Sequence, residues 1–141
     1  MNINTGYQQE IKELANMVHE IRDQFLRILI ESIENTDTKG TCGYACYFTK
    51  DLLDHFTDFK TTVRGGDGNG DGGYIDSNGG IQGHYWLEVV GAHDTYIVDI
   101  TADQFGDEPI IILPISTTDR YVNGCQDIVD EHFKDFLSAY R

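Results

Sequence analysis

Three residues that together could carry nucleophilic chemistry occur in the order Cys42, His84 and Asp99. A cysteine nucleophile needs an imidazole within hydrogen-bond reach and a third group that fixes the tautomer of that imidazole. Cys42 stands at the predicted first turn of a helix, where the helix dipole and free N–H groups favour thiolate over thiol. Its own backbone N–H is the natural first donor to an oxyanion. The three residue types therefore permit a Cys-His-Asp arrangement.

The second and third of these residues lie on two neighbouring predicted strands, and the register of the strands decides whether they share a face. With a four-residue turn, Val90 lies opposite Thr95. Thr101 then lies opposite His84, and Asp99 is its diagonal neighbour, within reach of an aromatic side chain. A shift of one residue would turn Asp99 to the other face.

The motifs around these residues resemble a known family, the transglutaminase-like branch of the papain-like cysteine enzymes. That branch is typified by a Gly-x-Cys helix start, a His-x-Trp strand and an Asp-x-Thr strand. The corresponding segments here are Gly40-Thr41-Cys42, Gly83-His84-Tyr85-Trp86-Leu87-Glu88-Val89 and Tyr96-Ile97-Val98-Asp99-Ile100-Thr101. The extension Thr101-Ala102-Asp103-Gln104-Phe105 is similar to segments of small bacterial and phage members. The resemblance covers just under half of the chain.

The resemblance implies a single papain-like domain over residues 1–141 and an acyl-transfer activity without a cofactor. Cys42 would be the nucleophile, His84 the general base and then acid, and Asp99 the orienting carboxylate. The substrate would be a protein or peptide amide, attacked to give a thioester that water or an amine captures. Family members include transglutaminases, protein-glutamine deamidases and peptidases. We favour deamidation or transamidation over peptide hydrolysis.

The second oxyanion donor is not identifiable from the sequence. Trp86, Gln104 and Asn35 are candidates, in that order, although Trp86 also suits a packing role beside the site. Cys46 falls inside the helix that Cys42 begins, which predicts a packing role, and Cys125 is expected to be structural.

A glycine-rich segment before His84 offers a second kind of site. Asp67, Asn69 and Asp71, followed by Gly72, match the first six positions of a calcium loop. Position twelve is Asn78 rather than the bidentate Glu, so this is a weak calcium candidate. The alternative is a flexible acidic loop that gates substrate access. No zinc site is expected.

The charge balance restricts the partners. The 141 residues carry 10 Lys and Arg against 24 Asp and Glu, a formal net charge of -14. This balance argues against direct binding of nucleic acid or of an anionic membrane surface. It leaves open two alternative functions: an acidic, non-catalytic binding or inhibitory protein that engages a basic protein surface, and a calcium-responsive module.

The same sequence suggests a cytoplasmic protein with reduced thiols. No apolar run approaches the ~20 residues that cross a bilayer. Met1 to Thr5 lack the basic and apolar regions of a secretory signal. Three cysteines cannot pair completely, and nothing else indicates a disulfide framework.

Hydrophobic periodicity predicts the α+β class, with N-terminal helices packed on an antiparallel sheet and a C-terminal helix. The first predicted helix runs from about Gln8 to Glu34 and ends at a polar stretch, Asn35 to Lys39. Its apolar stripe is Ile11, Leu14, Val18, Ile21, Phe25 and Ile28, interpreted as core packing rather than a partner-helix seam. Thr41 is the predicted N-cap of the second helix, whose shared face is Ala45, Thr49, Leu52, Leu53 and Phe56.

The remaining segments predict strands, one long loop and a closing helix. Phe59 to Arg64 alternates as a strand, and Gly65 to Gly83 is predicted as a long surface loop or a frayed hairpin. Gly83 to Val90 and Thr95 to Thr101 are predicted to form an antiparallel hairpin. Pro109 to Ile115 is predicted as a buried strand. Asp127 to Tyr140 is the predicted last helix, with Val129, Phe133, Phe136, Leu137 and Tyr140 on one side.

Overall fold

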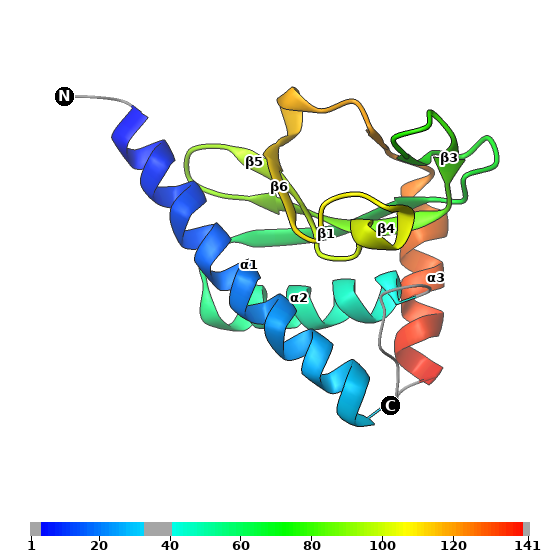
Figure 1. Cartoon of the computed structure of the whole chain (residues 1–141), viewed down its shortest axis with the longest axis horizontal. Helices are drawn as coiled ribbons and strands as arrows, with labels where there is room; N and C mark the ends of the chain where they lie inside the picture. Colours follow the sequence, from blue (N-terminus) through cyan, green and yellow to red (C-terminus); the bar gives the residue numbers. More distant parts are fainter. Residues whose placement is uncertain (1–3, 33–40, 140–141) are drawn as a thin grey trace.

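A computed structural model describes residues 4–32 and 41–139 and confirms the α+β class (Figure 1). The helices are α1 (Asn4–Ser32), α2 (Cys42–Phe56) and α3 (Gln126–Ala139), with 3-10 turns η1 (Ala102–Phe105) and η2 (Ile115–Thr117). The strands are β1 (Lys60–Gly66), β2 (Gly73–Ile75), β3 (Ile81–Gln82), β4 (His84–Val90), β5 (Thr95–Asp99), β6 (Ile111–Pro114) and β7 (Tyr121–Val122). The predicted polar stretch from Asn35 to Lys39, and Tyr140, lie outside the described residues.

The main sheet is antiparallel, in the order β1-β4-β5-β6. The predicted β4–β5 hairpin is confirmed, and Val90 pairs with Thr95, the register in which Asp99 is a diagonal neighbour of His84. Pairing of β4 with β5 extends from there to Leu87 and Val98. The hairpin therefore places the imidazole and the carboxylate on one face.

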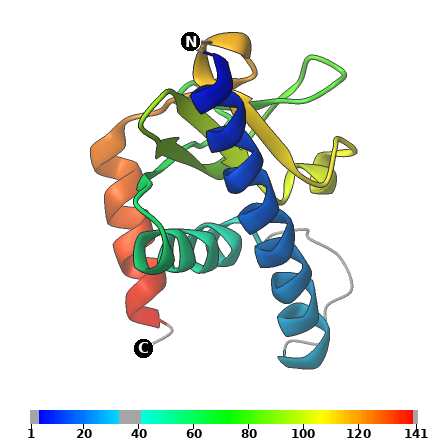
Figure 2. The ribbon, with the colours of Figure 1, turned by 90° about the vertical axis from the view of Figure 1, so that its left-hand side faces the viewer.

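Helices α1 and α2 cover the other face of this sheet (Figures 1 and 2). The core between them contains apolar side chains from both layers, among them Leu14, Val18, Phe25, Leu53, Leu87, Val89 and Val98. Burying each such side chain contributes about 1.5–3 kcal/mol. The stripe of α1 therefore packs in the core, with one correction: Leu29 is 1% exposed and completes it, whereas the predicted Ile28 is 39% exposed. Residues 21, 25 and 29 follow one another at steps of four, which keeps them over the core.

One expectation for α2 is wrong, and another is confirmed in position only. Phe56 was predicted on the core face, but it is 73% exposed because the helix ends there. Thr41 occupies the N-cap position, yet its side chain makes no capping hydrogen bond. The helix instead begins with the Ala45 N–H donating to the Thr41 carbonyl at 2.9 Å.

The glycine-rich segment is more ordered than a surface loop. Its strands β2 and β3 pair as a hairpin, and β7 completes a three-stranded sheet in the order β3-β2-β7. Tyr74 at its centre is fully buried. A Cβ at Gly66 would lie 2.2 Å from the Gly73 nitrogen, so the segment folds back closely over the end of β1. The hairpin alternative is thus confirmed, and a glycine-rich composition here reflects close backbone contact.

Of the last two predicted elements, the strand is shorter and more exposed than expected, whereas the helix agrees with its prediction. Strand β6 is an edge strand with Leu113 39% exposed, not a buried strand, because no strand pairs with its outer side among the described residues. Helix α3 packs beside β1 through the buried Val129 and the half-buried Phe133. None of the described helices is long and apolar enough to cross a membrane.

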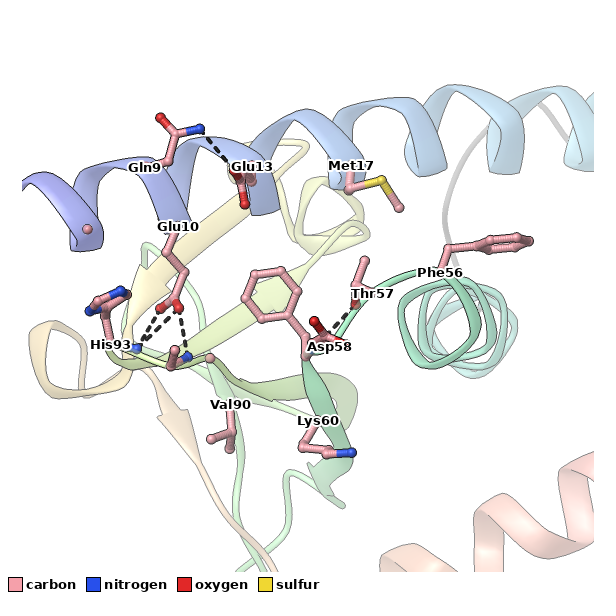
Figure 3. A pocket seen from close by; sticks show the side chains of 14 residues that line it. Gln9, Glu10, Glu13, Met17, Phe56, Thr57, Asp58, Lys60, Val90 and His93 are labelled. Atoms are coloured by element: carbon pink, nitrogen blue, oxygen red, sulfur yellow. Dashed lines mark hydrogen bonds between the residues drawn. The ribbon is translucent and has the colours of Figure 1, made fainter.

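A buried carboxylate ties α1 to the turn between β4 and β5 (Figure 3). Glu10 accepts hydrogen bonds from the backbone N–H groups of Ala92 at 2.7 Å and His93 at 3.1 Å, and from the Tyr96 hydroxyl at 2.8 Å. Burial raises the pKa of Glu10, but these hydrogen bonds outweigh it and leave the pKa lowered. The charged form therefore holds the hairpin turn against the helix.

A buried guanidinium ties α1 to the other end of β5. Arg22 donates to the carbonyl of Ile100, to the carbonyl of Pro109 at 2.8 Å, and to the Asp103 carboxylate at 2.7 Å. The backbone directly after Asp99 is fixed in this way.

Candidate active site

A cavity of about 300 Å³ lies where β1 ends and β4 begins. Its lining includes two of the sequence-predicted residues, Cys42 and His84. The other lining residues are Gly66, Asp67, Asp71, Gly83, Tyr85, Ile128, Val129 and His132. The start of α2, two strand ends and one face of α3 therefore converge on the sulfur.

His84 and Asp99 form a buried pair below this cavity. Each residue is 2% exposed, and His84 Nε2 lies 2.8 Å from Asp99 Oδ2. The same oxygen accepts the Tyr121 hydroxyl at 2.8 Å, and Oδ1 accepts the Thr101 N–H at 2.9 Å. The carboxylate is thus satisfied on both oxygens, and Nδ1 is the ring nitrogen left to exchange a proton.

The environment favours the charged form of both partners. Burial alone lowers the pKa of His84, but the charge and hydrogen bond of Asp99, with smaller contributions from Cys42, raise it to about 9. Burial raises the pKa of Asp99, yet His84, Thr101 and Tyr121 together leave it lowered. The pair is therefore an imidazolium and a carboxylate near neutral pH.

Cys42 is the first residue of α2 and is half-buried. It lines the same cavity as the His84 ring, and its proximity contributes to the raised pKa of His84. At the first helical position, its thiol also lies near backbone N–H groups that have no partner within the helix. The structure thus places Cys42 and His84 on the lining of one cavity and joins His84 to Asp99 by a hydrogen bond.

Aromatic rings enclose the imidazole on its remaining sides. Phe105 lies 5.0 Å and Tyr74 5.7 Å from the His84 ring, both in edge-to-face contact, and Trp86 lies 6.1 Å away. Tyr121 lies 5.1 Å from the Trp86 ring. The sequence predicts a packing role for Trp86 but gives no signal for Tyr74 or Tyr121, because the glycine-rich segment and a two-residue strand have no hydrophobic pattern.

None of the three candidates for the second oxyanion donor is found on the lining of the Cys42 cavity among the described residues. Trp86 is fully buried and does not line the cavity, and its Nε1 has no partner among the described residues, so it packs and does not face substrate. Gln104 also lies off the cavity lining; its amide nitrogen donates to the Thr101 carbonyl at 3.0 Å and lies 3.5 Å from His84 Nδ1. Asn35 lies outside the described residues.

Comparison with family models, curated proteins and solved structures finds no match.

The other two cysteines differ from each other. Cys46 is buried, and burial, with smaller contributions from Cys42 and Asp99, raises the pKa of its thiol, as a packing role requires. Cys125 was expected to be structural, but its side chain is exposed. It therefore provides a solvent-accessible reference thiol in the same chain.

The weak calcium candidate is not assembled as a cation site. Asp67 Oδ1 accepts the backbone N–H groups of Asn69 at 2.7 Å and Asp71 at 3.2 Å. Asp71 Oδ1 accepts the N–H of Cys125 at 2.9 Å. These oxygens face N–H donors, the reverse of what a cation needs. Within residues 4–32 and 41–139, no group of three His, Cys, Asp or Glu side chains could hold a metal ion.

A larger cavity, of about 740 Å³, lies elsewhere (Figure 3). It lies at the opposite end of the β1–β4 ladder, beside Lys60 and Val90, with Met17 and Phe56 along it. Its lining contains no cysteine, and the Glu10 carboxylate on it is bound to the hairpin turn. The size of this cavity alone does not make it the reactive site.

Proposed function

We propose that this protein is a cysteine-dependent acyl-transfer enzyme in which Cys42 is the nucleophile, His84 the general base and acid, and Asp99 the orienting carboxylate. The observation that carries the proposal is the buried His84–Asp99 hydrogen bond of 2.8 Å beside a thiol at a helix start. A buried imidazole with a raised pKa, on the lining of the same cavity as a cysteine, is what such chemistry needs.

The reaction proceeds in two halves. With the thiol proton held on His84, Cys42 Sγ attacks the carbonyl carbon of an amide. The carbonyl oxygen then becomes negatively charged. The C–N bond then breaks, the nitrogen leaves with the proton from His84, and a thioester remains on Sγ. Water next gives a proton to His84 as its oxygen attacks the thioester, the carboxylic acid is released, and the proton returns to the sulfur. An amine in place of water gives transamidation.

The favoured acyl donor is the side-chain carboxamide of a protein glutamine. A cavity of about 300 Å³ is at the small end of ligand sites and suits one extended side chain. Deamidation or transamidation is therefore placed ahead of peptide hydrolysis, and a papain-like fold of the transglutaminase-like type is the corresponding structural proposal.

Intact mass measurement tests the activity. Glutamine-bearing proteins incubated with the enzyme should gain about one mass unit per deamidated side chain, or more when an amine is added. Cys42→Ala should abolish the change, whereas Cys125→Ser, at an exposed thiol off the cavity, should not. Fragments instead of intact products would assign peptide hydrolysis.

A non-catalytic acidic binding protein is the rival function, favoured by the net charge of -14. Such a protein would associate with a basic partner at a rate that falls with added salt. If Cys42→Ala still binds a basic partner protein as the parent does, and added salt weakens that complex, the binding function replaces the enzymatic proposal.

A further inference from the structure

Tyr85 and His132 form a hydrogen-bonded pair on the wall of the Cys42 cavity. The Tyr85 hydroxyl lies 3.1 Å from His132 Nδ1, and both residues line the cavity. Tyr85 comes from β4, directly after His84, and His132 comes from α3. The mechanism proposed above uses neither residue and has a single identified oxyanion donor.

The ring of Tyr85 is held in place from two sides. Gly65 pairs with Tyr85 across the β1–β4 ladder, and a Cβ at Gly65 would lie 2.6 Å from Tyr85 Cδ1. The ring therefore lies directly against the backbone of β1, where only glycine leaves room for it. At its far end, the hydroxyl is fixed by His132. The ring and its oxygen are therefore in place before the reaction, and only the hydroxyl proton has to turn toward a developing charge.

The phenol keeps its proton in the cavity that it shares with Cys42. Burial first, and then the charges of Cys42 and Cys46, raise the pKa of Tyr85 above its ordinary value. A neutral hydroxyl can turn from His132 toward a new acceptor, because its proton rotates about the C–O bond. The Asp67 carboxylate, also on the cavity lining, only accepts, so it cannot serve an oxyanion.

We infer that the Tyr85 hydroxyl is the second oxyanion donor, acting with the backbone N–H of Cys42, and that His132 positions it. This rests on the proposed function. As Sγ adds to the carbonyl carbon, the hydroxyl donates a hydrogen bond to the carbonyl oxygen that gains the negative charge. No proton is transferred, and the hydrogen bond to His132 reforms when the tetrahedral intermediate collapses.

Two reagents separate this role from an effect on the sulfur itself. Acylation of Cys42 by 4-nitrophenyl acetate passes through a tetrahedral oxyanion, whereas alkylation by iodoacetamide displaces iodide and forms none. Both rates are measured in a Cys125→Ser background, which removes the exposed competing thiol. Tyr85→Phe should slow acylation at least about tenfold and change alkylation by less than about twofold. Tyr47→Phe, an exposed tyrosine on α2 that does not line the cavity, is the matched control.

Variants at His132 test the positioning role and do not depend on the folding of Tyr85→Phe. His132→Leu should slow acylation and leave alkylation unchanged. His132→Asn puts a side-chain oxygen near the position of Nδ1 and should recover most of the lost acylation rate. A melting curve of each variant verifies the fold.

The outcomes distinguish this inference from the function on which it rests. Equal loss of both rates in Tyr85→Phe would show that the tyrosine positions the sulfur and would overturn the inference. So would an unchanged acylation rate in that variant. If Cys42 of the parent protein reacts with neither reagent, the proposed function itself fails.

Discussion

Asp99 has two donors on one carboxylate oxygen and a backbone donor on the other. Because this buried anion is fully hydrogen-bonded, it can stay charged and hold His84 in one orientation. The orientation leaves Nδ1 as the ring nitrogen that Asp99 does not bind. A neutral asparagine at this position would orient the His84 ring less well than the Asp99 carboxylate does.

Tyr121→Phe removes one of these donors and should lower the free energy of unfolding by about 1.5–3 kcal/mol, because the lost hydrogen bond is to a charged acceptor. Urea unfolding followed by circular dichroism measures the change. Tyr47→Phe serves as the control at an exposed position. Equal stability of Tyr121→Phe and the parent protein would mean that the hydrogen bond contributes nothing to the fold.

At this scale, the sequence predicts residues that stand on regular elements. The side-chain alternation of two strands was sufficient to bring His84 and Asp99 onto one face. Tyr121 reaches Asp99 from a two-residue strand of a separate sheet, and Tyr85 meets His132 across two elements. Such long-range contacts depend on how the elements pack, which periodicity does not describe.

Among the elements, α2 buries one hydroxyl group that has no hydrogen-bond partner among the described residues. Thr49 is 2% exposed, and its hydroxyl has no hydrogen-bond partner among the described residues. Thr49 and the unpartnered Trp86 Nε1 belong to residues around the same narrow space between α2 and the sheet. A buried hydroxyl without a partner costs free energy.

Thr49→Val, which replaces the hydroxyl by a methyl group of similar size, should therefore raise the free energy of unfolding by about 1 kcal/mol. Thermal and urea unfolding of the two proteins measure this difference. Thr61→Val is the contrasting control, since the Thr61 hydroxyl donates to Asp54 at 2.6 Å. A less stable Thr49→Val would show that the hydroxyl is hydrogen-bonded in solution.

The predicted helices and the central hairpin are recovered because their periodicity extends over many residues. The shorter elements are not predicted. Strands β2, β3 and β7 have two or three residues each, which is too few to show an alternating pattern. The burial of Leu29 in place of Ile28 has a similar cause. Both lie near the same face of α1, and only the position of the neighbouring layer decides between them.

For the whole molecule, stability should depend on pH through the buried pair. The pKa of His84 is raised from 6.5 to about 9, so the folded state binds this proton more tightly than the unfolded state. The contribution is fully present below 6.5 and is lost as pH rises through about 9. The pKa of Asp99 is lowered, so its contribution is present above 3.8 and is lost as pH falls through the folded value.

Unfolding midpoints measured from acid to alkaline pH should therefore decline from near neutrality toward alkaline pH. His84→Gln should remove most of that decline and leave an acid limb, to which the lowered pKa of Glu10 also contributes. If parent protein and His84→Gln have the same alkaline slope, His84 is not charged in the folded state.

In the molecule as a whole, the proposed reactive site and the Glu10 contacts lie at opposite ends of the main sheet. The Cys42 cavity lies at one end of the β1–β4 ladder, and the Glu10 clamp lies near the other, roughly 20 Å away along seven-residue strands. Clamps by Glu10 and Arg22 fix both ends of β5 to α1. The hairpin that carries His84 and Asp99 is thus attached to the longest helix at two points.

The most direct measurement of the central proposal is the rate at which each cysteine of the intact protein is alkylated by iodoacetamide at mildly acidic pH, read by peptide mass mapping. Cys42 should react fastest, even though it is less accessible than the exposed Cys125. Cys125 should react more slowly, and the buried Cys46 should react slowest. His84→Gln should slow Cys42 at least about tenfold and leave Cys125 unchanged. If Cys42 reacts no faster than Cys125 and is insensitive to His84→Gln, the sulfur and the imidazole do not act together and the enzymatic account is wrong.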